Sequence, residues 1–446
     1  MTKDTCKEKI WELANLLRSA VYSRNIAFSV LRLLFLKYAL DNCIGAKTVE
    51  DMQACVKAQR MFARKDVEDG ISTIIPVLNY IDRAYQIDVL SGEKIVDEYA
   101  RELFGADRMT QKKNATESSF KSVIEFLGEM DLEEKDSERS LGKLLVREIT
   151  ELIQTGTDRN AFTGEFTTGN DLNRLAKEIL QVKKEDRFLD FTAGIGLSTL
   201  EITGDTLPYV THVERDSVVA ALAAMLYIMQ GYQEFYVSCS DALVRVLPEA
   251  TGNRIFIDPP LMARVEKTDW NPYTNASFAA LHLIMHNYLH EGTVAAMTVP
   301  SGTLFQTKKQ ALALREELVT AGMLKAVIAL PPLWRGTNVS TNLLVMSGER
   351  NAEGVLFIDA AEEAKTLKSR SKGGALTEET MERILQVLRT RDTVPGFSRM
   401  ASVSELQQTG FNLIPANYIT QPTEEDHTTI EEIDAQLAEL YRQLME

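Results

Sequence analysis

The stretch Arg187-Phe-Leu-Asp-Phe-Thr-Ala-Gly-Ile-Gly196 decides the fold of this chain. An apolar run ends in Asp190, two glycines (Gly194 and Gly196) follow, and the residues after them suit a helix. Glycine is needed where a strand folds sharply into a helix and a ligand must come close to the backbone. The spacing is not the GxGxxG of dinucleotide-binding turns, because no glycine stands three residues after Gly196. We therefore expect a strand–turn–helix unit, whose turn either holds a cofactor or is a tight turn alone.

Acidic residues stand at the ends of the next two predicted strands. The strand 209–214 ends in Glu214, where a carboxylate can accept both ribose hydroxyls of a nucleoside. The strand 235–240 is followed by Asp241, in position to bind an adenine amino group. An Asp-x-x-x-Gly-x-Gly turn is a form that holds the methionine part of S-adenosylmethionine, so together these acids predict that cofactor. The alternative is that these residues are ordinary surface acids of an acidic protein. This explains any one of the three acids, but it explains poorly why all three stand at successive strand ends.

Apolar strands alternate with helical patterns between residues 171 and 360. The predicted strands are 187–191, 209–214, 235–240, 254–257, 293–299, 325–330, 342–347 and 355–358. The helical patterns between them are 171–180, 217–230, 278–290 and 308–321. This alternation predicts an α/β fold, a doubly wound Rossmann-like domain around a largely parallel sheet. Because the last two strands follow closely, with a turn at 350–354, we expect them to form an antiparallel hairpin at the sheet edge.

Helical periodicity fills both ends of the chain. Apolar residues recur at helical spacing at Ile10, Leu13 and Leu17, and similar patterns continue to Leu152. We expect an all-helical domain over 1–155, the Rossmann-like domain over 156–362, and a C-terminal helical region over 363–446.

The C-terminal region carries two further patterns. The densest basic run lies between residues 365 and 372, and it suits either a solvated loop or a phosphate contact. The last helical pattern spaces its apolar residues 3, 4, 3 and 4 apart, as in a coiled-coil seam: Ile430, Ile433, Leu437, Leu440 and Leu444. Two heptads are too few for stability in water, so this helix either packs back on its own domain or docks on a partner helix.

Composition and charge narrow the class of protein. The chain of 446 residues carries a formal charge of −15, with 45% hydrophobic and 25% charged residues, which is ordinary for a soluble globular protein. No apolar stretch reaches the length that crosses a bilayer, so no membrane partner is expected. The absence of a secretory signal and of closely paired cysteines predicts a cytoplasmic protein. An acidic chain also needs a local patch or a more basic partner in order to act on nucleic acid.

The fourth predicted strand ends in Ile257-Asp-Pro-Pro-Leu261. The two prolines fix the backbone and remove two amide donors, which leaves the Pro259 carbonyl able to accept a hydrogen bond. The Asp258 carboxylate and this carbonyl can hold an amino group by both of its hydrogens, and so aim the nitrogen lone pair at an electrophilic methyl group. The alternative is an acid ahead of a proline turn.

Three histidines, His282, His286 and His290, stand four residues apart and would share one helix face. This spacing can serve a metal site, but no HExxH pattern accompanies it. We therefore expect a structural role for them and no metal.

With these motifs the chain resembles the modification subunits of type I restriction–modification systems, which are N6-adenine DNA methyltransferases. Asp190 to Gly196 stands at the place of that family's DPACGSG motif. Asp258-Pro-Pro-Leu261 stands at the place of its NPP motif with a following aromatic residue. Gly164-Glu-Phe-Thr-Thr168 resembles the GEF-x-TP segment that lies over the cofactor in the family. The likeness spans nearly the whole chain.

The resemblance implies methyl transfer from S-adenosylmethionine to the exocyclic nitrogen of an adenine that has left the DNA helix. The cofactor contacts that it implies are Glu165, Phe166, Thr168, Asp190, Thr192, Gly194, Gly196, Glu214 and Asp241. The catalytic positions that it implies are Asp258, Pro259, Pro260 and Leu261. It also implies assembly with a specificity subunit, through Ile430–Leu444, and with a restriction subunit. The specificity subunit would read the target in double-stranded DNA.

The chain departs from the family pattern at Leu261, which stands in place of the aromatic residue that stacks on the flipped base. Such stacking is worth about 1–3 kcal/mol per base. Tyr273, in the following loop, is a candidate substitute for that ring. Two functions stay open on these residues. One is the methyltransferase subunit, and the other is a weak or inactive homologue that binds S-adenosylmethionine or serves as a structural subunit of a defence complex.

Overall fold

The computed structural model describes residues 2–20, 25–64, 70–104, 117–155, 170–247, 250–260, 263–333, 341–350, 353–361 and 376–419. Its first part is helical, and these elements build it: α1 (Lys3–Ala20), α2 (Ile26–Asp41), α3 (Val49–Arg64), η1 (Gly70–Thr73), α4 (Ile75–Tyr85), α5 (Glu93–Phe104), α6 (Glu117–Glu129) and α7 (Ser140–Thr155). Helix α2 is the centre of this part, because its side chains are buried on every face. The Asn25 side chain caps its start by accepting a hydrogen bond from the amide of Phe28.

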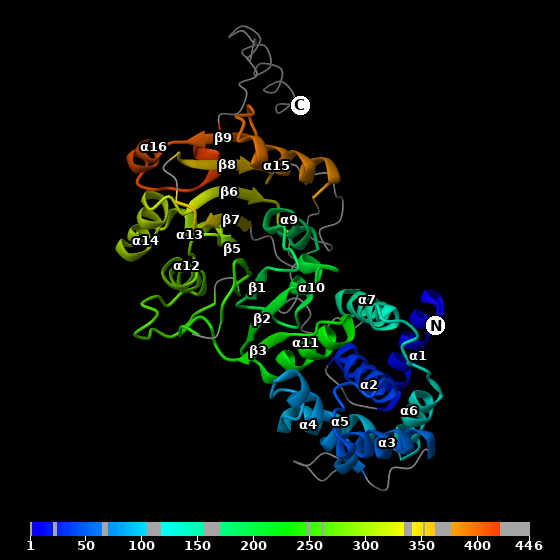
Figure 1. The fold of residues 1–446 in the computed structure, drawn as a ribbon. Coiled ribbons are helices and arrows are strands. Elements are labelled where there is room, and N and C mark those ends of the chain that lie inside the picture. Colours follow the sequence, from blue (N-terminus) through cyan, green and yellow to red (C-terminus); the bar gives the residue numbers. More distant parts are fainter. Residues whose placement is uncertain are drawn as a thin grey trace, which may run out of the picture.

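Within the described residues, nine strands form one sheet at the centre of the second part (Figure 1). The strands are β1 (Arg187–Asp190), β2 (Tyr209–Glu214), β3 (Phe235–Cys239), β4 (Arg254–Ile257), β5 (Val294–Pro300), β6 (Leu324–Leu330), β7 (Thr341–Ser347), β8 (Val355–Asp359) and β9 (Ser398–Ala401). Their order is β3-β2-β1-β4-β5-β7-β6-β8-β9. Strand β7 is antiparallel to both of its neighbours and β9 to β8, while the other neighbours are parallel. The predicted doubly wound α/β fold is confirmed.

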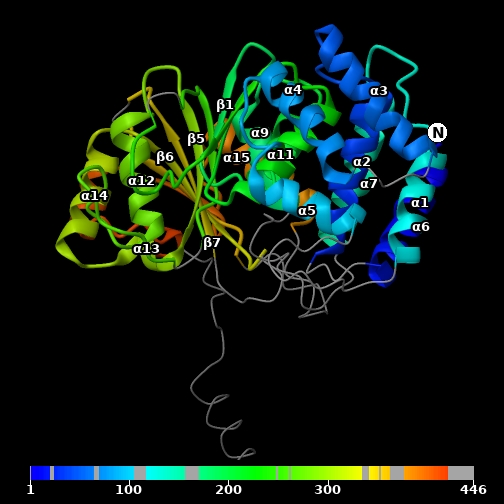
Figure 2. The same ribbon diagram turned by 90° about the horizontal axis from the view of Figure 1, so that it is seen from below.

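Helices cover both faces of the sheet (Figure 2). One face carries α9 (Asn170–Leu180), α10 (Leu197–Thr203), α11 (Ser217–Gln230) and α15 (Glu378–Thr390). The other carries α12 (Ala276–Asn287), α13 (Ser301–Phe305), α14 (Lys309–Thr320) and α16 (Val403–Gln408). Successive strand residues point to opposite faces, so that Phe188 belongs to the first core and Leu189 to the second.

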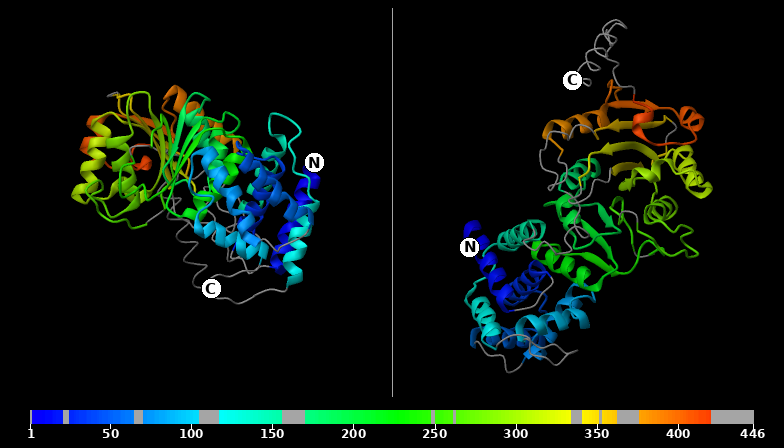
Figure 3. Two further views of the ribbon diagram at one scale, coloured as in Figure 1. Left: turned by 60° about the horizontal axis from the view of Figure 1, so that its bottom comes forward. Right: turned by 180° about the vertical axis from the view of Figure 1, so that it is seen from behind.

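The N-terminal helices pack against the first of these faces. Helices α2 and α7 contact α11. Figure 3 shows the blue and cyan N-terminal helices beside the green part of the α/β domain. One continuous apolar core therefore runs from α2 through α11 to the sheet. The strands of the sheet and the helical domain share this core, which crosses the domain boundary predicted near residue 155.

Two expectations for the end of the sheet are wrong. Strands β7 and β8 do not form a hairpin, because β7 pairs along one edge with β5 and along the other with β6. No edge of β7 is left, and β8 lies instead on the far side of β6. The sheet also continues past residue 362, since β9 pairs with β8 from within the region that was predicted to be helical. That region does contain α15, α16 and the short η2 (Pro415–Asn417).

Two predicted features of the tail lie outside the described residues, namely the basic run 365–372 and the helix 430–444. Among the helices that the structure describes, none combines the length and the apolar character that a bilayer crossing needs.

Candidate active site at the carboxyl edge of the sheet

The structure brings four of the predicted carboxylates to one edge of the sheet. Asp190 and Glu214 end β1 and β2, while Asp241 and Asp258 follow β3 and β4. These four strands are parallel neighbours in the order β3-β2-β1-β4, so their carboxyl ends lie side by side. The crevice outside the carboxyl ends of such strands is where α/β sheets bind ligands.

Asp190 is the most deeply buried of these acids. Its side chain accepts two hydrogen bonds, from the Thr192 amide and from the Thr199 hydroxyl, both at 3.2 Å. The pKa of the Asp190 carboxyl is raised to about 7, mainly by burial; the two hydrogen bonds act to lower it, and the nearby acids Asp258 and Glu214 act to raise it. Near neutral pH, the protonated and ionised forms of Asp190 are therefore both populated.

The turn after β1 depends on its two glycines. Gly194 and Gly196 have φ values of 55° and 80°, a region that residues with a side chain seldom adopt. A Cβ atom at Gly196 would lie 2.5 Å from Oη of Tyr227 and 2.9 Å from Cζ of the same ring. A side chain at Gly196 would thus collide with the buried Tyr227 ring.

Glu214, at the end of the neighbouring strand β2, is hydrogen-bonded to this turn. Its Oε2 accepts a hydrogen bond from the Gly194 amide at 3.1 Å, and its Oε1 accepts one from the Asp216 amide at 2.8 Å. Burial raises the pKa of the Glu214 carboxyl above its ordinary value. Next along the edge, Asp241 accepts a hydrogen bond from the Leu243 amide at 3.0 Å. The amide of Ser240 donates to the Glu214 carbonyl at 3.0 Å, which ties the ends of β2 and β3 together.

A buried polar pair supports the glycine turn from below. Nδ1 of His212 lies 2.9 Å from the hydroxyl of Tyr227, the ring that closes against Gly196. Burial lowers the pKa of His212 to about 3, so this imidazole is neutral. Sequence reasoning missed this pair, and it missed Thr199. The one available signal was a histidine inside the otherwise apolar run of β2.

Asp258 is positioned by two threonines. The hydroxyl of Thr298, on β5, donates a hydrogen bond to Oδ1 of Asp258. The amide of Asp258 donates to the hydroxyl of Thr192 at 3.2 Å, which joins the Asp-Pro-Pro segment to the glycine turn. Pro259 is buried and Pro260 is exposed. Thr192 was among the predicted site residues, whereas no local motif marked Thr298.

Four predicted site residues lie outside the described part of the chain: Glu165, Phe166, Thr168 and Leu261. Tyr273, the candidate substitute ring, is described. It stacks on Phe278 with ring centroids 5.9 Å apart, and its hydroxyl donates to the Gln310 carbonyl at 3.3 Å. Tyr273 is thus held between α12 and the start of α14.

The three histidines do not share one helix. Helix α12 ends at Asn287, so His290 lies beyond it, with Nε2 2.9 Å from the Asn287 carbonyl oxygen. The rings of His282 and His286 lie close together, with centroids 4.5 Å apart. In the described ranges, no group of three or more His, Cys, Asp or Glu side chains is placed to hold a metal ion.

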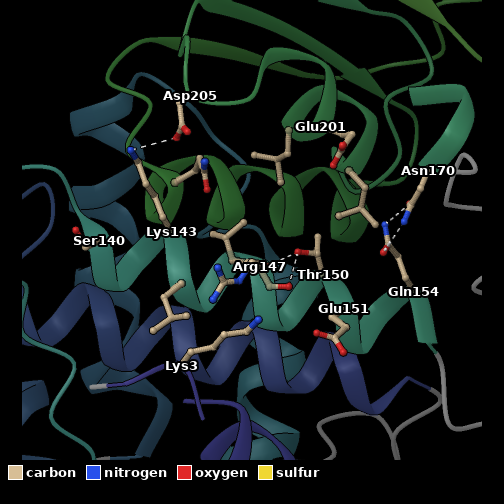
Figure 4. Close-up of a pocket in the computed structure, with 15 residues that line it drawn as sticks. Lys3, Ser140, Lys143, Arg147, Thr150, Glu151, Gln154, Asn170, Glu201 and Asp205 are labelled. Carbon is tan, nitrogen blue, oxygen red and sulfur yellow. Dashed lines mark hydrogen bonds and ion pairs between the residues drawn. The ribbon is translucent and has the colours of Figure 1, made fainter. Parts of the chain in front are cut away.

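A separate cleft of about 690 Å³ lies between α7 and α10 (Figure 4). None of the predicted site residues lines it. Polar pairs bridge its two sides: Lys143 lies 3.2 Å from Asp205, and the side-chain amide of Gln154 donates to Asn170 at 2.8 Å. Its charges are of both signs and partly paired, so we assign it to the contact between the helical domain and the α/β domain.

Comparison with solved structures identifies the fold. The fold is similar to that of a type I restriction-modification system methyltransferase subunit from Streptococcus thermophilus, at 20% identity and a TM-score of 0.69. That match covers 94% of this chain and 100% of the other. A modification subunit of a putative type I restriction enzyme from Vibrio vulnificus is similar with a TM-score of 0.64 and 17% identity, over 92% and 96% of the two chains. The protein has the fold of these methyltransferase subunits.

The sequence gives the family. The N-6 DNA Methylase family model matches residues 151–427, and the chain belongs to this family. Among curated proteins it is similar to two methylase subunits of type I restriction enzymes from Methanocaldococcus jannaschii, MjaVIII and MjaVII. The identities are 25% over 316 residues and 23% over 295 residues, or 63% and 59% of this chain. The matches cover 53% and 50% of those proteins, so the chain spans about half the length of the relatives that it matches.

Proposed function

We propose that this chain methylates the N6 amino group of adenine in DNA, as the modification subunit of a type I-like complex. One observation carries the proposal. The chain belongs to the N-6 DNA Methylase family, and its Asp258-Pro-Pro segment lies on the same sheet edge as three further acids. The segment is suited to hold an amino group, and the three acids are suited to a charged nucleoside cofactor.

The residues at this edge fit S-adenosylmethionine, whose chemistry when bound is the supply of an electrophilic methyl group on a positively charged sulfur. Glu214 has a carboxylate where the two ribose hydroxyls would donate, and Asp241 suits the adenine amino group. Asp190 and the glycine turn suit the methionine part, because a bare backbone admits the ligand closely and a carboxylate favours its ammonium group. A cationic ligand here would lower the pKa of Asp190 and favour its ionised form.

Asp258 would hold the adenine amino group together with the Pro259 carbonyl. Each accepts one N–H, which directs the nitrogen lone pair away from both and toward the methyl group. Thr298 and Thr192 keep the carboxylate and its backbone in place before the base arrives. As the N6–carbon bond would form and the sulfur–carbon bond would break, N6 would lose one proton to solvent. The Asp258 side chain is needed there as a hydrogen-bond acceptor, a role that an amide oxygen can also fill.

The acidic charge of −15 favours a more basic partner for reading DNA. We propose that a specificity subunit supplies this reading and docks on the helix predicted at 430–444. A restriction subunit is the further partner that the proposal includes.

The proposal is tested by sequencing modified bases in DNA from cells that express the chain with its genomic neighbours. Wild type and Asp258→Asn should both place N6-methyladenine at one defined motif, since Asn keeps an acceptor oxygen and restores the family's NPP segment. Asp258→Ala should place none. Absence of methylation in wild type, with the complex verified as assembled, would refute the proposal and favour a structural subunit.

A further inference from the structure

A pocket of about 550 Å³ lies beside the candidate active site. In the part of the chain that the structure describes, none of the predicted cofactor contacts lines it, and neither does any residue of the Asp258-Pro-Pro segment, but Tyr273, the candidate substitute ring, does. We call it the hairpin pocket. Three of its lining side chains are cationic: Arg264, Lys267 and Lys308. No acidic residue is among the described residues that line it. In a chain with a net charge of −15, such a local excess of positive charge marks a site for an anion.

The hairpin pocket belongs to the same sheet edge as Asp258. Arg264 and Lys267 follow β4, while Lys308 follows β5, and these two strands are parallel neighbours. The Pro260 carbonyl accepts a hydrogen bond from the Ala263 amide at 3.2 Å, so the Asp-Pro-Pro segment leads directly into the pocket wall. The pocket is therefore placed to contact a substrate that extends away from Asp258.

The segment that carries two of the cations is rigid. Residues 263–276 form a hairpin, in which the Val265 amide donates to the Thr274 carbonyl and the Ala276 amide to the Ala263 carbonyl, both at 3.0 Å. The fully buried Asn271 side chain donates to two carbonyls of the hairpin, at 3.1 and 3.0 Å. The backbone from which Arg264 and Lys267 extend is thus set before any ligand binds, which reduces the entropic cost of binding.

The surroundings of the hairpin pocket favour a nucleic-acid strand over a small anion. Trp270, on the hairpin, is 57% exposed, and Phe305, next to the lining residue Gln306, is 47% exposed. Exposed aromatic rings beside a cationic groove are typical of surfaces that bind the backbone and bases of nucleic acid. Lys308 also precedes the first turn of α14, where backbone N–H groups add partial positive charge.

The acidic residues near the pocket lie outside its lining. Glu266 and Asp269 lie on the hairpin but do not line the pocket. Glu317, farther along α14, lies 3.6 Å from His286. S-adenosylmethionine has no phosphate, so the cations also have no role in holding the proposed cofactor.

We propose that the hairpin pocket binds a phosphodiester group of the DNA strand that carries the target adenine. This inference rests on the proposed function and adds to it a contact made by this chain itself, apart from any specificity subunit. Through this contact the strand next to the flipped base is held against α12 and α14 while Asp258 binds the amino group.

The test is the salt dependence of DNA binding by the assembled complex, measured with a fluorescently labelled double-stranded oligonucleotide. The variants are Arg264→Gln, Lys267→Gln, Lys308→Gln and the triple substitution. Because the pocket holds one phosphodiester group, the triple variant should flatten the slope of log K against log salt by about 0.9, and each single variant by less. Affinity for the duplex should fall in step, while S-adenosylmethionine binding should not change.

Two controls separate charge from folding. Lys184→Gln removes an exposed lysine at the opposite edge of the sheet and should leave slope and affinity unchanged. Lys308→Arg keeps the charge and should keep the slope. An unchanged slope in the triple variant, or no duplex binding by the wild-type complex, overturns the inference. A flattened slope in a complex that transfers no methyl group would instead uphold the phosphate site and refute the proposed reaction.

Discussion

Asp190 differs from the other acids of the edge because it is almost entirely enclosed, at 1% exposure. Two hydrogen bonds at 3.2 Å are too few to offset the cost of burying a charge between two further carboxylates. The raised pKa follows from this arrangement. A cation at the methionine position would supply the missing compensation, so the empty crevice and the ligand-filled crevice favour different protonation states of one residue.

Stability should therefore depend on pH through Asp190. Its folded pKa of about 7 lies above the ordinary 3.8, so the folded state keeps a proton that the unfolded state has lost. The contribution of Asp190 to stability falls as pH rises from about 4 to about 7, by at most about 4 kcal/mol, and stays level above that. In Asp190→Asn this fall is absent. Urea unfolding at several pH values should show the free energy of unfolding of the variant rising relative to that of wild type between about pH 4 and about pH 7. If the two free energies change with pH in parallel, the raised pKa of Asp190 is contradicted.

The residues that carry chemical motifs could be identified from the sequence, whereas their supports could not. Asp190 and Glu214 end apolar runs, and Asp258 precedes two prolines, so local pattern was enough for them. Thr298 lies 40 residues from Asp258 and meets it only because β4 and β5 are neighbours. A threonine in an apolar strand has no local property that reveals such a partner.

Among the elements, the turn between β1 and α10 is the most constrained. Gly196→Ala should destabilise the fold by about 1–3 kcal/mol, since it puts a Cβ against the Tyr227 ring and a side chain at positive φ. Tyr227→Phe removes the oxygen that is nearest to the new atom. The double variant should therefore lose less stability than the sum of the two single losses, as measured by urea unfolding. Strict additivity would show that the clash with Tyr227 is not the cause.

Strand positions could be predicted from the sequence, but strand partners could not. All eight predicted strands begin and end within one residue of the observed bounds. The hairpin expected from β7 and β8 failed because pairing depends on which edges are already taken, and this is a property of the whole sheet. Strand β9 was missed because its four residues, Ser-Arg-Met-Ala, show no alternating pattern.

At the scale of the molecule, the helical domain and the α/β domain pack closely where α7 meets α11, beside the cleft between α7 and α10. Gly142, on α7, allows this approach, because a Cβ there would lie 2.2 Å from the Met229 carbonyl oxygen and 2.8 Å from the Tyr38 hydroxyl. Glu134 joins the same contact by accepting hydrogen bonds from the Gly142 amide at 2.7 Å and the Tyr38 hydroxyl at 2.9 Å. The interface is therefore packed like a core.

Gly142→Ala should destabilise the protein by about 1–3 kcal/mol by forcing α7 away from α11. Gly302→Ala is the matched control, since a Cβ at that position meets nothing within 4 Å. Differential scanning calorimetry should show a lower melting temperature for the first variant and an unchanged one for the second. Equal melting temperatures for both variants would mean that α7 adjusts without cost.

The strand order has a consequence for the nascent chain during synthesis. Once residue 300 has left the ribosome, β3, β2, β1, β4 and β5 can already assemble, but the outer edge of β5 stays unpaired until β7 emerges. Strand β6 is made first and cannot fill the gap, since it pairs with β7 and β8. An open apolar strand edge invites pairing with other chains. A ribosome that stalls between residues 300 and 341 would thus release a half-sheet prone to aggregation, while one that stalls shortly after residue 347 would release a sheet whose central gap is closed.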